Sequence, residues 1–297
     1  MRRILIDGNH LTGRCNATLS EMTTSRGVPS GVVYGFLRGL HYLHLEHNVD
    51  YPEITVCWDR GRSEKRMALY PEYKANRTKD QTPEQEQAYI QYVKQIHALQ
   101  GVLDTIGCRQ VYAQKVEADD LVGIFSRHYS ECGETVLIYS GDHDMHQLVT
   151  ENIKILDPKK GILDVDAIEK HWGVKVWMIP ELKAVMGDSS DNIAGVKGLG
   201  PVRARLFLQY YDCPLKDIPA KDQKYVKLAR DNYSIIERNL LLMKIPRSWE
   251  ESFYTEDQAL EAMECLLNSG QLRDERKFFE FLYAWELNSI LENPTRW

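Results

Sequence analysis

Short apolar runs with acidic residues at their ends recur along the first half of the chain. They lie at residues 3–7 (RILID), 53–59 (EITVCWD) and 134–140 (ETVLIYS), and the last is followed by GDHD. Apolar runs of this length, bounded by turn residues, are typical of strands buried in an α/β sheet. We therefore predict three strands whose carboxyl ends carry acidic side chains, at the edge where open α/β sheets bind ligands.

Apolar residues that recur every three or four positions indicate helices elsewhere in the chain. Helices are expected at residues 32–43, 82–100, 121–129, 225–238, 257–268 and 275–291, and a β-hairpin at residues 153–163. The stretch from residue 60 to residue 100 is polar and charged, and its helix is only weakly amphipathic, so we expect it to be exposed. No internal repeat or low-complexity linker marks a domain boundary.

Acidic residues gather at five places along the chain, three of them at the ends of the predicted strands. Each place has a local explanation, such as a turn or the first turn of a helix. The VEADD stretch (116–120) is harder to explain locally, because three carboxylates in four positions repel one another unless a cation offsets their charge. The coincidence of five such places favours one shared site. The candidate residues are Asp7, Asp59, Glu117, Asp119, Asp120, Asp142, Asp144, Asp188 and Asp191.

Carboxylate oxygens are hard ligands, and a site built from them without a cysteine or histidine pattern favours Mg²⁺ or Mn²⁺ over zinc. The six cysteines are widely spaced with no C-x-x-C pair, so we expect reduced thiols in the core. His41, His44 and His47 recur at a spacing of three, which drifts around a helix, and we expect no metal there. Two divalent ions about 4 Å apart are the usual device for hydrolysing a phosphodiester. The acids therefore predict a pair of Mg²⁺ or Mn²⁺ ions.

A glycine-paced stretch follows the last two acids and opens a helix that carries arginines. Glycines allow tight turns and the close approach of a ligand, Pro201 suits a first helical position, and free amides at a helix start attract phosphate oxygens. Such a turn can hold a nucleic-acid backbone without reading its sequence, but taken alone it is equally consistent with a plain turn between helices. The candidate DNA contacts are Gly195, Lys197, Gly198, Gly200, Arg203 and Arg205, with Ser30 as the expected cap of the helix at residues 32–43.

The segment YPEYKANR (70–77) places aromatic and basic side chains before the exposed helix. Tyr73 is suited to stack on a base, and Lys74 and Arg77 are suited to grip a phosphate. A Tyr-Lys-x-x-Arg pattern by itself is more often a solvated surface, so this segment gains weight only from the acids elsewhere in the chain.

The composition is that of an ordinary globular protein, with 43% hydrophobic and 27% charged residues among 297. A net charge of −6 argues at first against a polyanionic partner, but setting the nine candidate acids aside changes it to +3. No apolar run approaches the ~20 residues that a membrane span needs, and the opening MRRILID breaks off too early for a signal peptide. We expect a cytoplasmic monomer with no membrane partner.

Taken in order, these motifs resemble those of the structure-specific 5′ nucleases, a family that includes flap endonucleases, phage 5′-3′ exonucleases and the 5′ nuclease domain of bacterial DNA polymerase I. The matching segments are LIDG (5–8), WD (58–59), YPEYKANR (70–77), VEADD (116–120), SGDHD (140–144) and MGDSSDNIAGVKGLG (186–200). Each is weak alone, but together they cover roughly residues 3–210 and are highly specific. The length is similar to that of stand-alone bacteriophage members, which would act in the cytoplasm of the bacterial host.

The resemblance implies a PIN-like α/β fold, with a mainly parallel central sheet flanked by helices. Residues 1–180 would form the catalytic domain, with a helical arch at about 65–100. Residues 181–297 would form a helical DNA-binding region, with a helix-hairpin-helix at about 186–210. A K⁺ ion on carbonyls of the hairpin at 195–200, as in relatives, would accompany the two divalent ions.

The activity that the resemblance implies is cleavage of 5′ flaps and 5′ ends of DNA near junctions of single-stranded and duplex DNA, leaving a 5′-phosphate. RNA primers in RNA–DNA hybrids are a further substrate class, and replication and repair are the setting. By position, Lys74 and Arg77 would orient and neutralise the scissile phosphate, and Tyr73 would stack on the terminal base. The first metal region would use Asp7, Asp59, Glu117, Asp119, Asp120 and Asp142, and the second Asp144, Asp188 and Asp191.

Three other functions stay open at this point. A phosphatase of the haloacid dehalogenase type also begins with a strand that ends in Asp, but its second Asp two positions later is Asn9 in this chain. A PIN-type ribonuclease would use a similar acidic cluster on single-stranded RNA, and a catalytically silent DNA-junction-binding protein would use the hairpin alone. Cleavage of a 5′-flap DNA compared with unstructured RNA, and the effect of Asp142→Ala, separate these functions from that of a 5′ nuclease.

Overall fold

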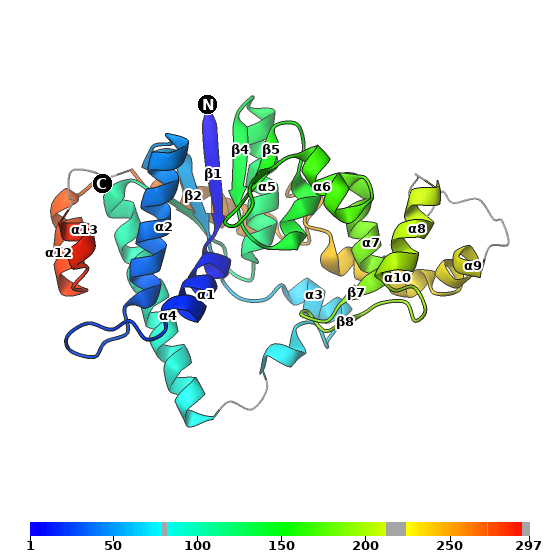
Figure 1. The fold of residues 1–297 in the computed structure, drawn as a ribbon, viewed down its shortest axis with the longest axis horizontal. Coiled ribbons are helices and arrows are strands. Elements are labelled where there is room, and N and C mark those ends of the chain that lie inside the picture. The colour runs from blue at the N-terminus through cyan, green and yellow to red at the C-terminus, as the bar shows by residue number, and fades with distance from the viewer. Residues whose placement is uncertain (79–81, 212–223, 272, 293–297) are drawn as a thin grey trace.

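The computed structural model describes residues 1–78, 82–211, 224–271 and 273–292. A six-stranded sheet with the order β3-β2-β1-β4-β5-β6 forms its centre, and all neighbouring strands are parallel except β5 and β6 (Figure 1). Across the sheet, the strands are β3 (Arg109–Val111), β2 (Ile54–Cys57), β1 (Arg2–Asp7), β4 (Thr135–Tyr139), β5 (Ile153–Asp157) and β6 (Gly161–Leu163). The three strands and the β-hairpin predicted from the apolar runs are confirmed, whereas the short strand β3 was not predicted.

Side chains of the central strands alternate between two apolar layers. Ile4 and Ile6 of β1 belong to one layer and Leu5 to the other, and all three are completely buried. Because both faces of the sheet are covered, the strands appear in the sequence as unbroken apolar runs rather than as alternating ones.

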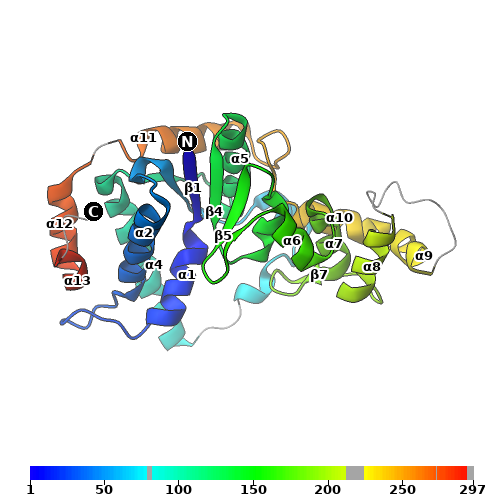
Figure 2. The ribbon, with the colours of Figure 1, turned by 45° about the horizontal axis from the view of Figure 1, so that its top comes forward.

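One apolar layer contains one face of the sheet together with helices from both ends of the chain (Figures 1 and 2). These helices are α1 (Gly8–Leu19), α2 (Gly31–His47), α4 (Pro83–Leu103), α12 (Glu275–Ala284) and α13 (Asn288–Leu291). Residues 82–90, at the start of α4, are all exposed, and this end of the helix projects away from the sheet (Figure 1). The helix predicted at 82–100 is therefore confirmed, with Thr82 as its cap, but its exposure is confirmed only for the first half. From Gln95 onward the helix packs into the core through Ile96 and Leu99, so the prediction of an exposed helix is wrong there.

The second apolar layer contains the opposite face of the sheet together with the middle and later helices of the chain. These are α5 (Ala118–Glu131), α6 (Val165–Trp172), α7 (Ile179–Met186), α8 (Pro201–Tyr211), α9 (Lys224–Asp231), α10 (Tyr233–Met243) and α11 (Glu256–Asn268). The short α3 (Glu64–Leu69) contacts α10. Single 3₁₀ turns complete the structure: η1 (Tyr51–Glu53), η2 (Ala75–Thr78), η3 (Asp104–Ile106), η4 (His143–Leu148) and η5 (Val176–Met178). Among the helices described, none combines the length and apolar character that crossing a bilayer requires.

Several elements differ from the prediction for local reasons. The helix expected at 225–238 is divided into α9 and α10 at Asn232, and the one expected at 275–291 is interrupted where Glu286 adopts a φ of 53°. Gly8 begins helix α1 instead of forming a turn after the first strand. A Cβ at Gly8 would lie 2.5 Å from the Trp58 ring, so close packing of α1 explains this glycine.

The segment between α7 and α8 contains a small antiparallel ladder, β7 (Gly187–Asp188) with β8 (Ile193–Ala194), which was not predicted. A Cβ at Gly195 would lie 2.0 Å from the carbonyl oxygen of Met186, so only glycine allows this close approach. Gly198 has a φ of 95°, which also favours glycine. Helices α7 and α8, which flank this segment, contact each other. A helix-hairpin-helix that binds DNA stays a prediction for this segment.

Strand β1 lies where the chain changes direction across the sheet. From β1 the chain continues to β2 and β3 on one side, and then returns to β4 and β5 on the other. In doubly wound sheets, this change of direction leaves a crevice at the carboxyl ends of the strands. The acidic residues after β1, β2 and β4 therefore meet at one edge of the sheet.

Candidate active site

A pocket of about 750 Å³ opens at the carboxyl edge of the sheet. The ends of β1, β2 and β4, the start of α5 and the segment after α7 form its walls. Eight of the nine candidate acids line it: Asp7, Asp59, Glu117, Asp119, Asp142, Asp144, Asp188 and Asp191. The structure thus brings these residues together, whereas their individual roles as metal ligands stay predictions.

Three of the acids follow strands, and each uses one carboxylate oxygen to order the backbone nearby. Oδ1 of Asp7 accepts a hydrogen bond from the N–H of His10 at 2.9 Å. Oδ1 of Asp142 accepts one from the N–H of Asp144, also at 2.9 Å. Oδ1 of Asp59 accepts the N–H of Ala118, the first residue of α5, at 2.6 Å. Burial, followed by repulsion from Asp59 and Asp142, raises the pKa of Asp7 to about 7. A bound cation would relieve this repulsion.

The start of α5 brings Glu117, Asp119 and Asp120 together, with one ligand atom of each within 4.8 Å of the others. Burial, followed by repulsion from Asp120 and Glu117, raises the pKa of Asp119 well above its ordinary value. Although burial disfavours the charged form of Glu117, Arg66 and Lys74 lower its pKa. In this group, nearby cations therefore balance the negative charge of Glu117 but not that of Asp119.

Asp120 is not among the residues that line the pocket, because other side chains hold its carboxylate, and its role as a metal ligand stays a prediction. It is 1% exposed. Its Oδ1 and Oδ2 accept from the Nη2 and Nη1 of Arg66 at 2.8 and 2.6 Å, and the Tyr254 hydroxyl also donates to Oδ2. Nη1 of Arg66 donates at 2.6 Å to Oε2 of Glu117 as well. Asp120 therefore holds Arg66 against Glu117, a contact that no sequence motif indicated because Arg66 and Tyr254 lie far away along the chain.

The expectation that Tyr73 stacks on a base is wrong for this structure, because its side chain is buried with 3% exposure. Its ring belongs to a small apolar cluster with Ile193, Leu242 and Met243. Its hydroxyl donates to Oε2 of Glu117 at 3.0 Å. The motif showed that Tyr73 lies near the site, but only the packing shows that it supports a carboxylate.

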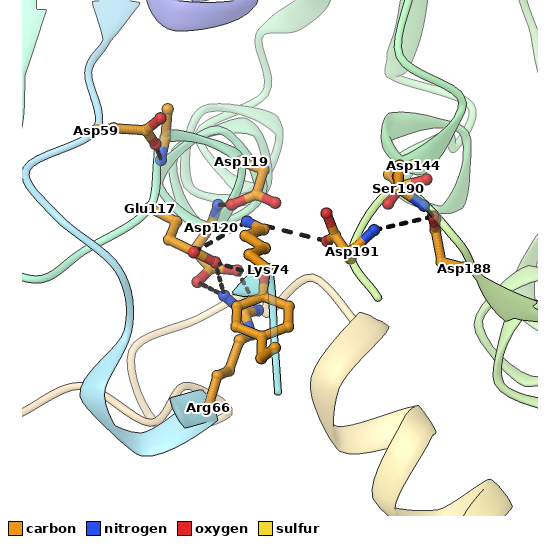
Figure 3. Close-up of polar contacts among 12 residues, drawn as sticks. Asp59, Arg66, Lys74, Glu117, Asp119, Asp120, Asp144, Asp188, Ser190 and Asp191 are labelled. Carbon is orange, nitrogen blue, oxygen red and sulfur yellow. Dashed lines mark hydrogen bonds and ion pairs between the residues drawn. The ribbon is translucent and has the colours of Figure 1, made fainter. Parts of the chain in front are cut away.

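Lys74, the next residue, lines the pocket between two groups of acids (Figure 3). Its Nζ lies 2.9 Å from Oε1 of Glu117 and 3.9 Å from Oδ2 of Asp191, and its backbone N–H donates to the Asp191 carbonyl oxygen at 2.9 Å. Although burial disfavours the charged form of Lys74, Asp119 and Glu117 raise its pKa. These contacts hold the residue at a φ of 55°, which is uncommon outside glycine.

Asp144 and Asp188 lie on the other side of Asp191 from the α5 acids (Figure 3), and a lysine joins them. Nζ of Lys183, on α7, donates to Oδ1 of Asp144 and lies 3.2 Å from Oδ2 of Asp188. Burial disfavours the charge of Lys183, but Asp144 and Asp188 raise its pKa. Ser190 donates to Oδ1 of Asp188 from its N–H at 2.8 Å and from its Oγ at 2.5 Å. No sequence motif indicated Lys183, because its partners lie on other elements.

The candidate DNA contacts after β8 are mostly accessible. Lys197, Gly198, Gly200 and Arg203 are exposed, and Nη1 of Arg203 donates to the Gly198 carbonyl oxygen at 3.1 Å. Arg205 is half-buried, and its Nε has no hydrogen-bond partner. This exposure suits a turn that binds a nucleic-acid backbone, and contact with DNA stays a prediction.

Ser30 starts α2 as predicted, but it does not offer a phosphate site. The residue is 1% exposed, and its side chain makes no capping hydrogen bond. The N–H groups of Val32 and Val33 already donate to Oε1 of Gln95, at 3.0 and 3.4 Å. Because these helix amides have a partner, the expectation of phosphate binding at Ser30 is wrong for this structure.

The remaining sequence predictions concern residues outside the pocket. Arg77 lies in η2, but its side chain and Cys213 are outside the described residues. The five cysteines described are free thiols, and three of them are buried, whereas Cys132 is exposed. His41 and His44 bond within the protein, to Tyr51 and to a backbone carbonyl, as expected for ordinary helix residues.

The pocket fits divalent cations by the chemistry of its side chains. Eight carboxylates line it, against the two ammonium groups of Lys74 and Lys183, and no cysteine is among its lining residues. Burial, with added repulsion from neighbouring carboxylates, raises the pKa of Asp7 and of Asp119, so a bound cation would favour their charged forms. Hard oxygen ligands with excess negative charge favour Mg²⁺ and Mn²⁺.

A mostly parallel α/β sheet with a carboxylate-lined pocket at its switch point is the arrangement expected of an enzyme that acts on phosphodiesters. Residues 2–173 match the model of the 5′-3′ exonuclease N-terminal resolvase-like domain. The chain belongs to this 5′-3′ exonuclease family, as its motifs predicted.

Two relatives show how the chain corresponds to known proteins. It is 34% identical over 230 residues to a 5′-3′ exonuclease of Buchnera aphidicola, a match that covers 77% of each chain. It is also 34% identical over 219 residues to DNA polymerase I of Caldicellulosiruptor bescii, covering 71% of this chain but only 24% of the polymerase. The similarity thus spans most of the stand-alone exonuclease and about a quarter of the polymerase.

Solved structures confirm the predicted fold class. The 5′-exonuclease of bacteriophage T5 superposes with a TM-score of 0.74 at 21% identity, covering 91% of this chain and 100% of that one. Flap endonuclease-1 of Methanococcus jannaschii superposes with a TM-score of 0.54 at 15% identity, covering 95% and 86%. At these identities the likeness concerns the fold alone.

Proposed function

We propose that the protein is a divalent-metal-dependent 5′ nuclease that cuts 5′ flaps and 5′ ends of DNA near junctions of single-stranded and duplex DNA. Its products would carry a 5′-phosphate, and RNA primers paired with DNA would be a second substrate class. The setting would be DNA replication and repair in the cytoplasm, with the protein acting as a monomer.

The observation that carries this proposal is the convergence of carboxylates from five separate parts of the chain on one pocket. Eight acids meet there, and two lysines offset only part of their charge. Two divalent ions in such a pocket would activate water and stabilise the leaving oxygen of a phosphodiester. Two structural neighbours support a nucleic-acid substrate: a flap endonuclease of bacteriophage T5 in complex with DNA and metal ions, and the catalytic core of Rad2 in complex with DNA substrate.

The carboxylates would divide between two metal regions. One would use the acids after β1, β2 and β4 and those of α5, and the other would use the acids near Lys183. The residues proposed for the first region are Asp7, Asp59, Glu117, Asp119 and Asp142, with Asp120 behind them, and those for the second are Asp144, Asp188 and Asp191.

Lys74 would neutralise and orient the scissile phosphate. Its ammonium group lies in the pocket between Glu117 and Asp191, and those acids keep it charged. A fixed cation at this position favours the phosphate as negative charge develops on it in the transition state. Arg77, three residues later, would supply a second cation.

The segment after β8 would hold the duplex backbone. Its exposed Lys197 and Arg203 and its glycine amides suit phosphate oxygens rather than base edges. We propose residues 1–180 as the catalytic part, with the exposed half of α4 as one side of an arch, and residues 181–297 as the DNA-binding part. A K⁺ ion on the turn carbonyls would strengthen this grip.

Product mapping on a labelled 5′-flap duplex, with and without Mg²⁺, tests the proposal. We expect cleavage near the junction in Mg²⁺ only, and much weaker cutting of unstructured RNA. Asp142→Ala is expected to lower the cleavage rate by several orders of magnitude while flap binding in Ca²⁺ is largely retained. A normal cleavage rate in Asp142→Ala would show that the pocket carboxylates are not needed for the reaction and would refute the proposal. Preferential cutting of RNA would favour a ribonuclease instead.

A further inference from the structure

Three histidines from two elements gather at the rim of the pocket. His143 and His146 lie on η4 and His171 on α6, and their ring centroids are 4.9 to 5.8 Å apart. His143 and His171 are exposed, whereas His146 beneath them is 1% exposed. His143 also lines the carboxylate pocket, so the group is continuous with it. None of these rings has been given a role in the proposed reaction.

A hydrogen bond fixes the proton position of the buried ring. Nε1 of Trp172 donates to Nδ1 of His146 at 2.9 Å. Because an indole N–H is only a donor, Nδ1 must accept, and the proton of the neutral ring lies on Nε2. Nε2 is buried and has no partner. The ring therefore presents an N–H donor that lacks an acceptor.

Two basic side chains, Lys160 and Arg205, act on the histidines that lie on the side of the carboxylate pocket. Burial, followed by the charges of His143 and His171 and then Lys160, lowers the pKa of His146 to about 4. Burial, followed by His143, Lys160 and Arg205, lowers the pKa of His171. Asp157 has the opposite effect on the pKa of His146, and its Oδ1 already accepts the N–H groups of residues 159 and 160 at 2.8 and 2.9 Å.

The position of this group connects two parts of the proposed DNA path. Lys160 is an exposed residue of the turn between β5 and β6, and Arg205 lies on α8, directly after the glycine turn. Nε of Arg205, like Nε2 of His146, is a buried donor without a partner. The group adjoins the carboxylate pocket through His143, the charge of Arg205 on α8 acts on His171, and the group offers donors and positive charge.

We infer that His143, His146, His171, Lys160 and Arg205 form a phosphate-binding subsite for the DNA backbone. The subsite binds a phosphodiester of the substrate strand or its complement beside the pocket. Its positive charge neutralises part of the DNA backbone next to the acidic pocket. A transition-metal ion is the poorer ligand, because the Trp172 hydrogen bond leaves His146 with a proton on the nitrogen that would face the metal. The inference rests on the proposed DNA substrate.

Binding of a fluorescent 5′-flap duplex in Ca²⁺, measured by anisotropy over a series of KCl concentrations, tests the subsite. Lys160→Ala is expected to weaken binding roughly three- to tenfold at low salt and to reduce the slope of log K against log[KCl] by about 0.9, the effect of one lost phosphate contact. His171→Gln should weaken binding with little change in slope, since the neutral ring contributes a hydrogen bond. Lys170→Ala removes an exposed lysine of the same helix as His171 and should leave affinity and slope unchanged.

Unchanged affinity and slope in Lys160→Ala, or an equal effect of Lys170→Ala, would overturn the subsite. Tight Zn²⁺ binding to the wild-type protein that His171→Gln abolishes, measured by calorimetry, would overturn it in favour of a metal site. A wild-type protein that shows no salt-dependent binding to the flap duplex would instead refute the proposed function. The two failures are therefore distinguishable.

Discussion

Replacing Arg66 by methionine tests whether the buried charges behind the pocket are held as the structure indicates. The Arg66 side chain is 3% exposed, and its guanidinium donates to Glu117 and Asp120, whose side chains are 5% and 1% exposed. Methionine fills a similar volume but leaves both carboxylates without this cation. Glu117 keeps Lys74 and Tyr73, whereas Asp120 keeps the Tyr254 hydroxyl.

The cost follows from the charge that is left unpaired. Breaking a buried ion pair by removing one partner destabilises a protein by about 3–5 kcal/mol. For a chain of this size, that corresponds to a fall in unfolding midpoint of roughly 10 °C. Arg127→Met provides the control, because Arg127 is 42% exposed and its bonds to Glu131 and Glu251 lie at the surface. It should cost less than about 1 kcal/mol.

The difference between wild type and Arg66→Met also has a defined pH dependence. Arg66 and Lys74 lower the pKa of Glu117 against the effect of burial, so its ion pairs stabilise the fold above the ordinary carboxyl pKa of 4.5 and are lost as pH falls below it. In the variant, a carboxylate without its cation binds a proton more readily. The two proteins should therefore differ most at neutral pH and converge under acidic conditions.

Urea unfolding followed by tryptophan fluorescence, at pH 7.5 and pH 5 and without divalent ions, measures these free energies. Adding Mg²⁺ should stabilise Arg66→Met more than wild type, because the ion meets more uncompensated charge. A loss below about 1 kcal/mol at pH 7.5, or a loss that grows towards pH 5, would refute the account of Arg66 as the counter-charge of Glu117 and Asp120.

Three further predictions concern individual residues of the site. Lys183→Met should lower the Mg²⁺ concentration at half-saturation, seen by calorimetry, because Lys183 occupies Asp144 and Asp188 in the structure; an unchanged or higher value would contradict this competition. Asp7→Asn should stabilise the metal-free protein at pH 7.5, since a folded-state pKa of about 7 makes the fold lose stability as pH rises from the ordinary value of 3.8. That gain should vanish near pH 4, and a gain independent of pH would contradict it. Gly195→Ala should lower the unfolding midpoint strongly, because its Cβ would meet the Met186 carbonyl oxygen at 2.0 Å, whereas Gly200→Ala, with no atom within 4 Å, should not; equal midpoints would show that the turn adapts.

The sequence alone determined the class of fold and the family. Buried strands of a parallel sheet require unbroken apolar runs, and the acids at their ends stand where the topology of such sheets places a ligand. For that reason Asp7, Asp59 and Asp142 could be assigned to one edge without coordinates. Each short motif already contains what places these acids in a common pocket, namely a buried strand followed by an acidic residue.

The tertiary structure decided which side chains face the pocket and what lies behind them. Tyr73 and Lys74 are neighbours in one motif, yet packing buries the first under Glu117 and turns the second into the pocket. The sequence predicts Ser30 as a helix cap whose neighbouring amides could bind phosphate. In the structure, Gln95 of another helix accepts the hydrogen bonds of these amides. Arg66, Lys183 and Tyr254 carry no motif, because a counter-charge or a supporting hydroxyl is defined by distance in space. Their positions depend on how helices pack, which the spacing of residues along the chain does not fix.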